Sequence, residues 1–108
     1  MIDNSKFLQV RNVLALLRSE SAACPRTDEC IEALMHKYDM LFLGENFNVI
    51  YTDELRRSME KYFDISVSRE DLVEMTPSLC KSLDMTYEAF CNASDETRKI
   101  SVYSVKLF

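Results

Sequence analysis

The sequence predicts a single, mainly helical domain with a small β component. Apolar residues recur at helical spacing through most of the chain, and two short segments instead alternate apolar and polar side chains. The 108 residues include one glycine and two prolines, the residues that strand-rich folds use in their many turns. With 47% hydrophobic and 29% charged residues, the chain also has enough apolar side chains for a packed core.

The first two helices are predicted in the N-terminal part of the chain. Residues 4–19 place apolar side chains on one helical face, namely Phe7, Val10, Val13, Leu14 and Leu17. A connection is expected over residues 21–26, because Pro25 disfavours continuous helix. Thr27 is expected to cap the start of the second helix, and Gly44 is expected to cap its end in a left-handed conformation.

Local capping patterns predict the next two helices. Residues 46–51 alternate apolar and polar side chains, which indicates a short strand or extended segment before them. Thr52 is expected to cap a third helix, because two acidic residues follow where the helix dipole favours negative charge. Ser68 is expected to open a fourth helix, since Asp71 three residues later completes a capping-box pattern.

The C-terminal part of the chain leaves one element open. Thr76 and Pro77 predict an interruption, with a new helix over residues 77–85, because proline suits the first position of a helix. Residues 86–93 fit either a helix or a strand, whereas residues 100–108 are β-like. A short strand needs a partner, which is either residues 86–93 as a hairpin or an earlier extended segment.

Charge and hydropathy argue against several classes of function. The net charge is −5, from 13 basic and 18 acidic residues, so the average field repels nucleic acid and anionic membranes. No run approaches the roughly 20 apolar residues that cross a membrane. The N-terminal apolar run is too short for a signal peptide and has no basic segment before it. We therefore expect a cytoplasmic protein.

No combination of residues predicts an enzyme. The four cysteines are spaced without a C-x-x-C pair and are expected to be free thiols, namely Cys24, Cys30, Cys80 and Cys91. Gaps of six residues separate Cys24, Cys30 and the only histidine, His36, which is poor spacing for zinc or for a Cys–His nucleophile. The acidic clusters are explained by helix starts, and one glycine cannot build a phosphate-binding loop. We expect no metal, no cofactor and no enzymatic activity.

One arrangement of elements suggests DNA binding. From Thr52 the predicted order is helix, short extended link, two helices with a tight junction, and a hairpin, which is the order of a winged helix-turn-helix. In that interpretation the second helix of the pair would read bases. The residues that would contact nucleic acid are Ser78, Lys81 and Ser82 on that helix, Arg98, Lys99 and Lys106 on the hairpin, and Arg56 and Arg57 on the preceding helix.

The charge balance favours a different function, a non-enzymatic regulator or inhibitor that docks on a larger, basic protein. Glu70, Asp71 and Glu74 form the acidic set expected to meet that partner. Six Met, six Phe and five Tyr residues add side chains that are common in interfaces. Small inhibitors of nucleic-acid enzymes from phages and mobile elements have this size and charge. The comparison is an analogy with that class of protein. The DNA-binding regulator, dimeric through the first helix, is the alternative.

These interpretations share one domain organisation. Residues 1–108 are expected to form a single domain, with a two-helix part over residues 1–44 and, in the DNA-binding interpretation, a winged-helix-like part over residues 52–108.

Overall fold

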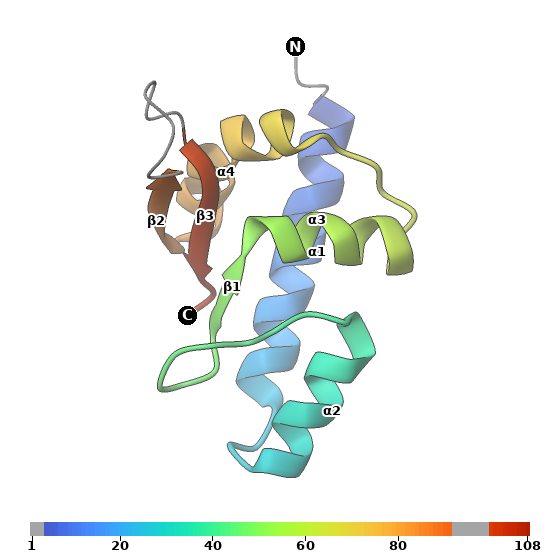
Figure 1. Ribbon diagram of the computed structural model, residues 1–108, viewed down its shortest axis with the longest axis vertical. Helices are drawn as coiled ribbons and strands as arrows, with labels where there is room; N and C mark the ends of the chain where they lie inside the picture. Colours follow the sequence, from blue (N-terminus) through green and yellow to red (C-terminus); the bar gives the residue numbers. More distant parts are fainter. Residues whose placement is uncertain (1–3, 92–99) are drawn as a thin grey trace.

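The computed structural model describes residues 4–91 and 100–108, and its architecture is mainly helical with one small antiparallel sheet (Figure 1). This confirms the predicted fold class. In chain order the elements of the described residues are α1 (Asn4–Ala23), α2 (Asp28–Tyr38), β1 (Val49–Tyr51), α3 (Thr52–Tyr62), α4 (Arg69–Leu83), β2 (Thr86–Cys91) and β3 (Ile100–Lys106).

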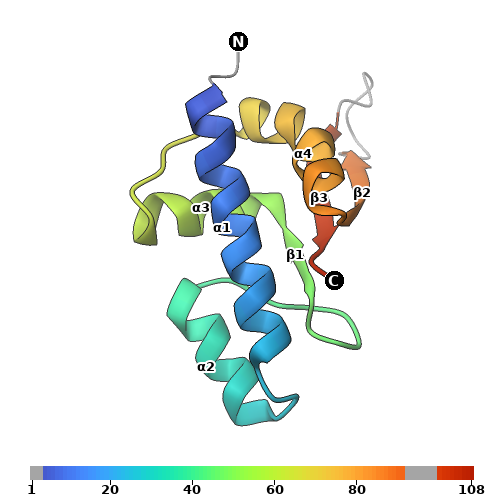
Figure 2. The ribbon, with the colours of Figure 1, turned by 180° about the vertical axis from the view of Figure 1, so that it is seen from behind.

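Helix α1 is the longest element, and it runs lengthwise along the front of the molecule in Figure 2. Its inner face is buried as predicted, through Val10, Val13, Leu14 and Leu17. The helix continues to Ala23, so the expectation of a connection from residue 21 was wrong. Ser21 is buried, and its hydroxyl donates to the carbonyl oxygen of Phe47 at 3.1 Å. This contact holds the last turn of α1 against the chain that enters β1.

Helix α2 begins as predicted but ends early. The Thr27 hydroxyl accepts a hydrogen bond from the amide of Cys30 at 3.3 Å, which confirms the N-cap. The helix ends at Tyr38, where Asp39 takes the left-handed conformation with φ of 48°. Gly44 therefore does not cap this helix. It has φ of 87° in a turn before β1, where its carbonyl oxygen accepts a hydrogen bond from the Phe47 amide.

The early end of α2 follows from what the next residues bury. Met40 and Phe42 are both buried, while Leu41 between them is 48% exposed. That alternation is the period of an extended chain, and a helix does not produce it. Burial of two large side chains in the core therefore outweighs continuation of the helix.

Helix α3 does not use Thr52 as a cap. Thr52 is its first helical residue, the N-cap is Tyr51, and no side chain there bonds the helix amides. The Thr52 hydroxyl is buried and instead accepts a hydrogen bond from the backbone amide of Tyr103 at 3.0 Å. The residue therefore joins the start of α3 to β3.

Helix α4 is continuous from Arg69 to Leu83, so the predicted break before residue 77 was wrong. The Ser68 hydroxyl accepts a hydrogen bond from the Asp71 amide at 3.1 Å, which confirms the predicted start. Pro77 lies inside the helix and removes one backbone donor. The helix persists because a single stripe at helical spacing is buried across the proline, comprising Leu72, Met75, Thr76, Leu79, Cys80 and Leu83.

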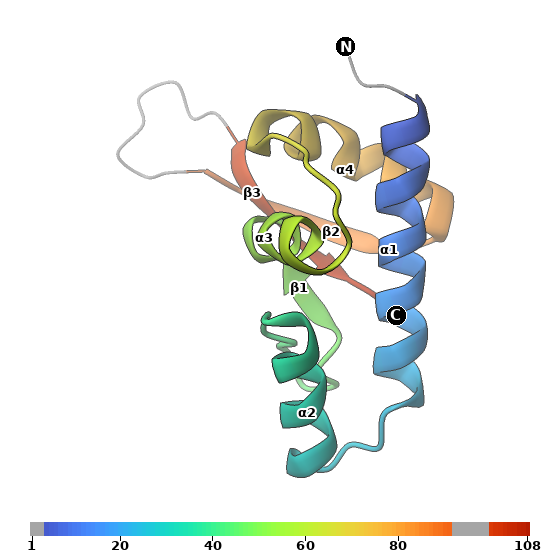
Figure 3. The same ribbon diagram turned by 90° about the vertical axis from the view of Figure 1, so that its right-hand side faces the viewer.

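The sheet has the strand order β1-β3-β2, and both pairs are antiparallel. Residues 86–91 form strand β2, which settles the alternatives left open for the described part of that segment. The register places Ile50 of β1 and Tyr87 of β2 on either side of Val105 in β3. Helices α3 and α4 cover one face of this sheet, as the side view shows (Figure 3).

One hydrophobic cluster joins all four helices to the sheet. It includes Leu17 of α1, Leu34 of α2, Leu55 of α3, Leu79 of α4 and Val105 of β3. Among the described residues, no helix combines the length and the apolar character needed to cross a membrane.

Candidate partner-binding surface on helix α4

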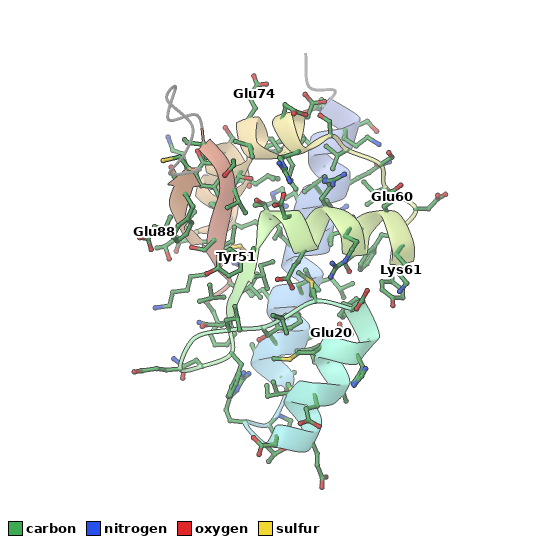
Figure 4. All side chains as sticks on the ribbon, viewed as in Figure 1. Glu20, Tyr51, Glu60, Lys61, Glu74 and Glu88 are labelled. Atoms are coloured by element: carbon green, nitrogen blue, oxygen red, sulfur yellow. The ribbon has the colours of Figure 1, made fainter. Side chains whose placement is uncertain are left out.

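The solvent face of α4 carries most of the residues predicted to bind a partner. Glu70, Glu74 and Ser78 are exposed and follow one another at four-residue spacing, which places them on one side of the helix. Lys81 is exposed and continues the same side toward the C-terminal end. Figure 4 shows the Glu74 side chain pointing away from the body of the molecule. We call Glu70, Glu74, Ser78 and Lys81 the α4 stripe.

Asp71 belongs to the start of the helix more than to this stripe. Asp71 is half-buried, and its backbone amide donates a hydrogen bond to the Ser68 hydroxyl. Its position next to Glu70 rotates it about 100° around the helix axis. The structure therefore brings Glu70 and Glu74 together and sets Asp71 to one side.

The two stripe carboxylates are not neutralised within the described part of the chain, where neither Glu70 nor Glu74 has an ion-pair partner. By contrast, Asp53 at the start of α3 binds Arg69 through two contacts of 3.1 and 3.3 Å. Like charges four residues apart destabilise a helix by roughly 0.2–0.5 kcal/mol. The stripe therefore keeps a local negative field at a small cost in stability.

A hollow of about 410 Å³ lies beside the stripe, between the start of α1 and α4. Phe7 and Met75 give it an apolar part, and Asn4, Glu74 and Ser78 give it polar groups. We call it the α1–α4 hollow. Lysine and arginine combine an apolar stem with a cationic end, so such a side chain fits both parts of the hollow.

The described residues proposed to contact DNA come from three elements, α4, β3 and α3. Lys106 is exposed and lies at the end of β3, where it pairs with Thr86 at the start of β2. Arg98 and Lys99 lie outside the described residues. Ser82 is exposed, but its hydroxyl donates to the carbonyl oxygen of Leu79 at 2.8 Å and accepts from Arg11 at 3.1 Å.

The two arginines of α3 are also engaged or partly covered. Arg57 donates to the carbonyl oxygen of Asp39 at 2.9 Å, which ties α3 to the end of α2. Arg56 is half-buried. Neither therefore extends a basic surface from α3 onto α4.

The residues considered for metal or nucleophilic chemistry do not converge. Burial and the neighbouring Cys30 thiol raise the pKa of Cys24, so these two cysteines are close together. His36 lies on α2 six residues after Cys30 and lines a cavity that neither cysteine lines. In residues 4–91 and 100–108, no group of three or more His, Cys, Asp or Glu side chains is placed to hold a metal ion.

That cavity, of about 510 Å³ between α2 and α3, is larger than the α1–α4 hollow, but three of its polar residues, Asp39, Glu54 and Arg57, already make contacts within the fold. Glu54 accepts a hydrogen bond from the Leu41 amide at 2.6 Å. Asp39 pairs with Lys61 at 3.4 Å. These contacts hold the segment after α2 against α3, which leaves few groups for a ligand.

The contribution of α1 to the hollow was not predicted from the sequence. Asn4 and Phe7 reach Glu74 only because α1 and α4 pack together, more than 60 residues apart along the chain. Phe7 was correctly placed on the inner side of the first helix, but no local pattern says which helix it meets.

A comparison of the chain with known protein families, with curated proteins and with solved structures found no match in any of the three.

Proposed function

We propose that this protein is a small, non-enzymatic interaction domain of the cytoplasm that regulates or inhibits a larger, basic, nucleic-acid-binding protein. The observation that carries the proposal is the pair of exposed carboxylates, Glu70 and Glu74, which have no ion-pair partner among the described residues and lie beside the partly apolar α1–α4 hollow. A basic groove that normally holds phosphates would meet these carboxylates by the same charge complementarity.

The geometry supports docking of cationic side chains one at a time. Glu74 borders the hollow, so a lysine or arginine of the partner can pair with its carboxylate while the stem lies on Phe7 and Met75. Glu70, one helical turn earlier, is placed for a second cation. The net charge of −5 adds long-range attraction, which raises the rate of association at low salt.

The first experiment identifies the class of partner. The full chain is used for affinity capture from its source cells, with and without nuclease, followed by mass spectrometry. A basic protein recovered equally in both samples supports the proposal, and it then serves as the purified partner below. Recovery that disappears with nuclease contradicts it.

The second experiment locates the surface. Glu70→Lys with Glu74→Lys reverses the stripe, whereas Glu45→Lys with Glu60→Lys makes the same charge change on exposed glutamates elsewhere. We expect the stripe variant to lower the association rate constant roughly tenfold at low salt, and the control to lower it less. Circular dichroism checks that both variants are folded. Equal effects of the two variants would mean that only net charge matters and that the stripe is not the docking surface.

A winged-helix DNA-binding regulator is the second candidate function. The observation that favours it is the chain order of α3, α4, β2 and β3, with the sheet order β1-β3-β2. In that arrangement α4 would enter the major groove and offer Ser78 and Lys81. Its first turns would then bring Glu70 and Glu74 toward the phosphates, which is unfavourable.

Duplex DNA distinguishes the two candidates. If the protein reads DNA, replacing Arg98, Lys99 and Lys106 with alanine should weaken binding and lower the log–log salt slope by up to about 3. Fluorescence anisotropy over a salt series measures both quantities. Binding of duplex DNA tighter than about micromolar at physiological salt favours the regulator over the protein-docking domain.

A further inference from the structure

Two of the four cysteines lie at the same end of the helix pair formed by α1 and α2. Cys24 is the first residue after α1, and Cys30 is the third residue of α2. The two helices lie side by side, and the short connection between them reverses the direction of the chain (Figure 3). Contacts of Glu20 with Lys37 and Tyr38 hold the helices in this arrangement. The turn therefore brings together two cysteines that are six positions apart in the sequence.

Hydrogen bonds tighten the connection between the two cysteines. The Thr27 amide donates to the carbonyl oxygen of Pro25 at 2.8 Å, and the Cys30 amide donates to the Thr27 hydroxyl at 3.3 Å. Before the turn, the Cys24 amide donates to the carbonyl oxygen of Ser21 at 3.3 Å. Residues six positions apart within one continuous helix would lie on different faces. The break between α1 and α2 is therefore what lets these two side chains approach each other.

The two thiols are neighbours and are accessible from solvent. Burial raises the pKa of Cys24, the Cys30 thiol raises it further, and nearby Arg26 acts in the opposite direction. Both cysteines are half-buried, and the five residues between them are all exposed. A small oxidant in solution can therefore reach both sulfur atoms.

The other two cysteines are placed differently. Cys80 is fully buried in α4, and burial raises its pKa to about 11, which keeps this thiol protonated and unreactive. Cys91 is exposed at the end of β2, and its pairing partner on β3 is Ile100. Of the four cysteines, all of which the structure describes, Cys24 and Cys30 are the pair that combines proximity with access.

We propose that Cys24 and Cys30 form a redox-responsive modification site, at which hydrogen peroxide converts the two thiols into an intrachain disulfide. One thiolate attacks a peroxide oxygen, which breaks the O–O bond, forms a sulfenic acid and releases water after protonation. The other thiolate attacks the sulfenic sulfur, which forms the S–S bond and releases a second water molecule. The two thiols thus lose two electrons and two protons, and the peroxide becomes two water molecules. This inference does not rest on the proposed function.

The disulfide would close a ring around a turn that is anchored to distant parts of the fold. Arg26, inside the ring, donates to the carbonyl oxygen of Asn46 at 2.6 Å, and its guanidinium lies 5.6 Å from the centre of the Phe108 ring. Oxidation therefore adds a covalent link where these contacts meet. In a reducing compartment such a disulfide is transient, because thiol reductants reverse it by exchange.

Peptide mapping of the full chain tests the proposal. Trypsin cleaves after Arg26, so Cys24 and Cys30 fall in separate peptides, residues 19–26 and 27–37. The reduced protein is treated with hydrogen peroxide, and the remaining thiols are blocked with N-ethylmaleimide before digestion. Mass spectrometry should find these two peptides joined, about tenfold or more above any other joined pair, because the turn holds the two thiols together. Dithiothreitol should separate them, and a non-reducing gel should show a monomer.

Two variants serve as controls. Cys91→Ser removes an exposed cysteine outside the pair and should give as much of the joined species as the wild type. Cys30→Ser should give no species that joins Cys24 to another cysteine, since Cys80 is buried and Cys91 belongs to the sheet. Circular dichroism confirms that both variants are folded. The proposal is overturned if peroxide oxidises Cys91 but leaves Cys24 and Cys30 as thiols, or if the joined peptides come only from dimers on the gel.

Discussion

Thr52 connects two elements through a single buried hydroxyl. It starts α3, is 2% exposed, and accepts the hydrogen bond of the Tyr103 amide in β3 at 3.0 Å. Tyr103 faces the core from the middle of its strand. Removal of the hydroxyl would leave the buried Tyr103 amide without its acceptor. This costs more free energy than an average hydrogen bond contributes.

Thr52→Val should therefore lower the free energy of unfolding by about 1–3 kcal/mol, although it preserves the shape of the side chain. Urea denaturation measures the change. Thr52→Ser keeps the hydroxyl and is the matched control, with a smaller loss. If Thr52→Val loses no more stability than Thr52→Ser, which keeps the hydroxyl and lacks only the methyl group, the hydrogen bond contributes little.

Glu20 joins α1 to α2 (Figure 4). Its carboxylate binds Lys37 at 2.7 Å and accepts a hydrogen bond from the Tyr38 hydroxyl. Burial alone would raise the pKa of Glu20, but the contacts with Lys37 and Tyr38 prevail and hold this pKa below its ordinary value. The ionised form is therefore favoured more in the folded protein than in the unfolded chain.

This shift predicts a pH-dependent effect of Glu20→Gln. A lowered folded-state pKa contributes stability above the unfolded value of about 4.3, and this contribution is lost as the pH falls through the folded value. At neutral pH the variant should be less stable by on the order of 1 kcal/mol, and the difference should shrink below pH ~4. Denaturation curves of both proteins between neutral and acidic pH test this. A difference that stays constant over that range would contradict the assigned role.

Helix α4 keeps a proline in its interior. Pro77 lies on the partly exposed side and has no amide to donate to the preceding turn. In the preceding turn, the Thr76 hydroxyl donates to the carbonyl oxygen of Leu72 at 2.6 Å. Burial of residues on both sides of the proline, from Leu72 to Leu83, holds the helix together despite this loss.

Pro77→Ala should raise the free energy of unfolding by about 1–2 kcal/mol. Proline costs about 3 kcal/mol relative to alanine inside a helix, and the greater freedom of the unfolded alanine chain offsets roughly 1 kcal/mol of that. Thermal denaturation measures the gain. Pro25→Ala, in the connection between α1 and α2, is the control and should not stabilise the protein. A loss of stability in Pro77→Ala would mean that the proline ring itself makes packing contacts that the helix needs.

The charge of the whole molecule affects the proposed association with a basic partner. The chain carries −5, so it attracts a basic partner at long range. Salt screens this attraction.

Raising the salt concentration from about 50 to about 500 mM should therefore weaken the complex with the basic partner. Surface plasmon resonance with the captured partner measures the change. An affinity that stays the same over this range would mean that the complex does not depend on charge.

Features that depend on interactions within one or two helical turns could be predicted from the sequence. The starts of α2 and α4 were readable because Thr27 and Ser68 each bond an amide three residues ahead. The inner face of α1 was readable from its periodicity. Fold class followed from these patterns, and the exposed acidic pair Glu70 and Glu74 followed from the same helix.

Features that depend on a partner far along the chain could not be predicted locally and became evident in the folded protein. Residues 86–91 fit a helix or a strand by their own pattern, and they form a strand because β3 supplies their hydrogen bonds. The end of α2 at Tyr38 and the continuity of α4 through Pro77 reflect core burial that outweighs local preferences. The α1–α4 hollow exists because Phe7 packs beside Met75, 68 positions away. Local hydrogen bonds act over a few residues, whereas side-chain burial depends on which distant elements meet.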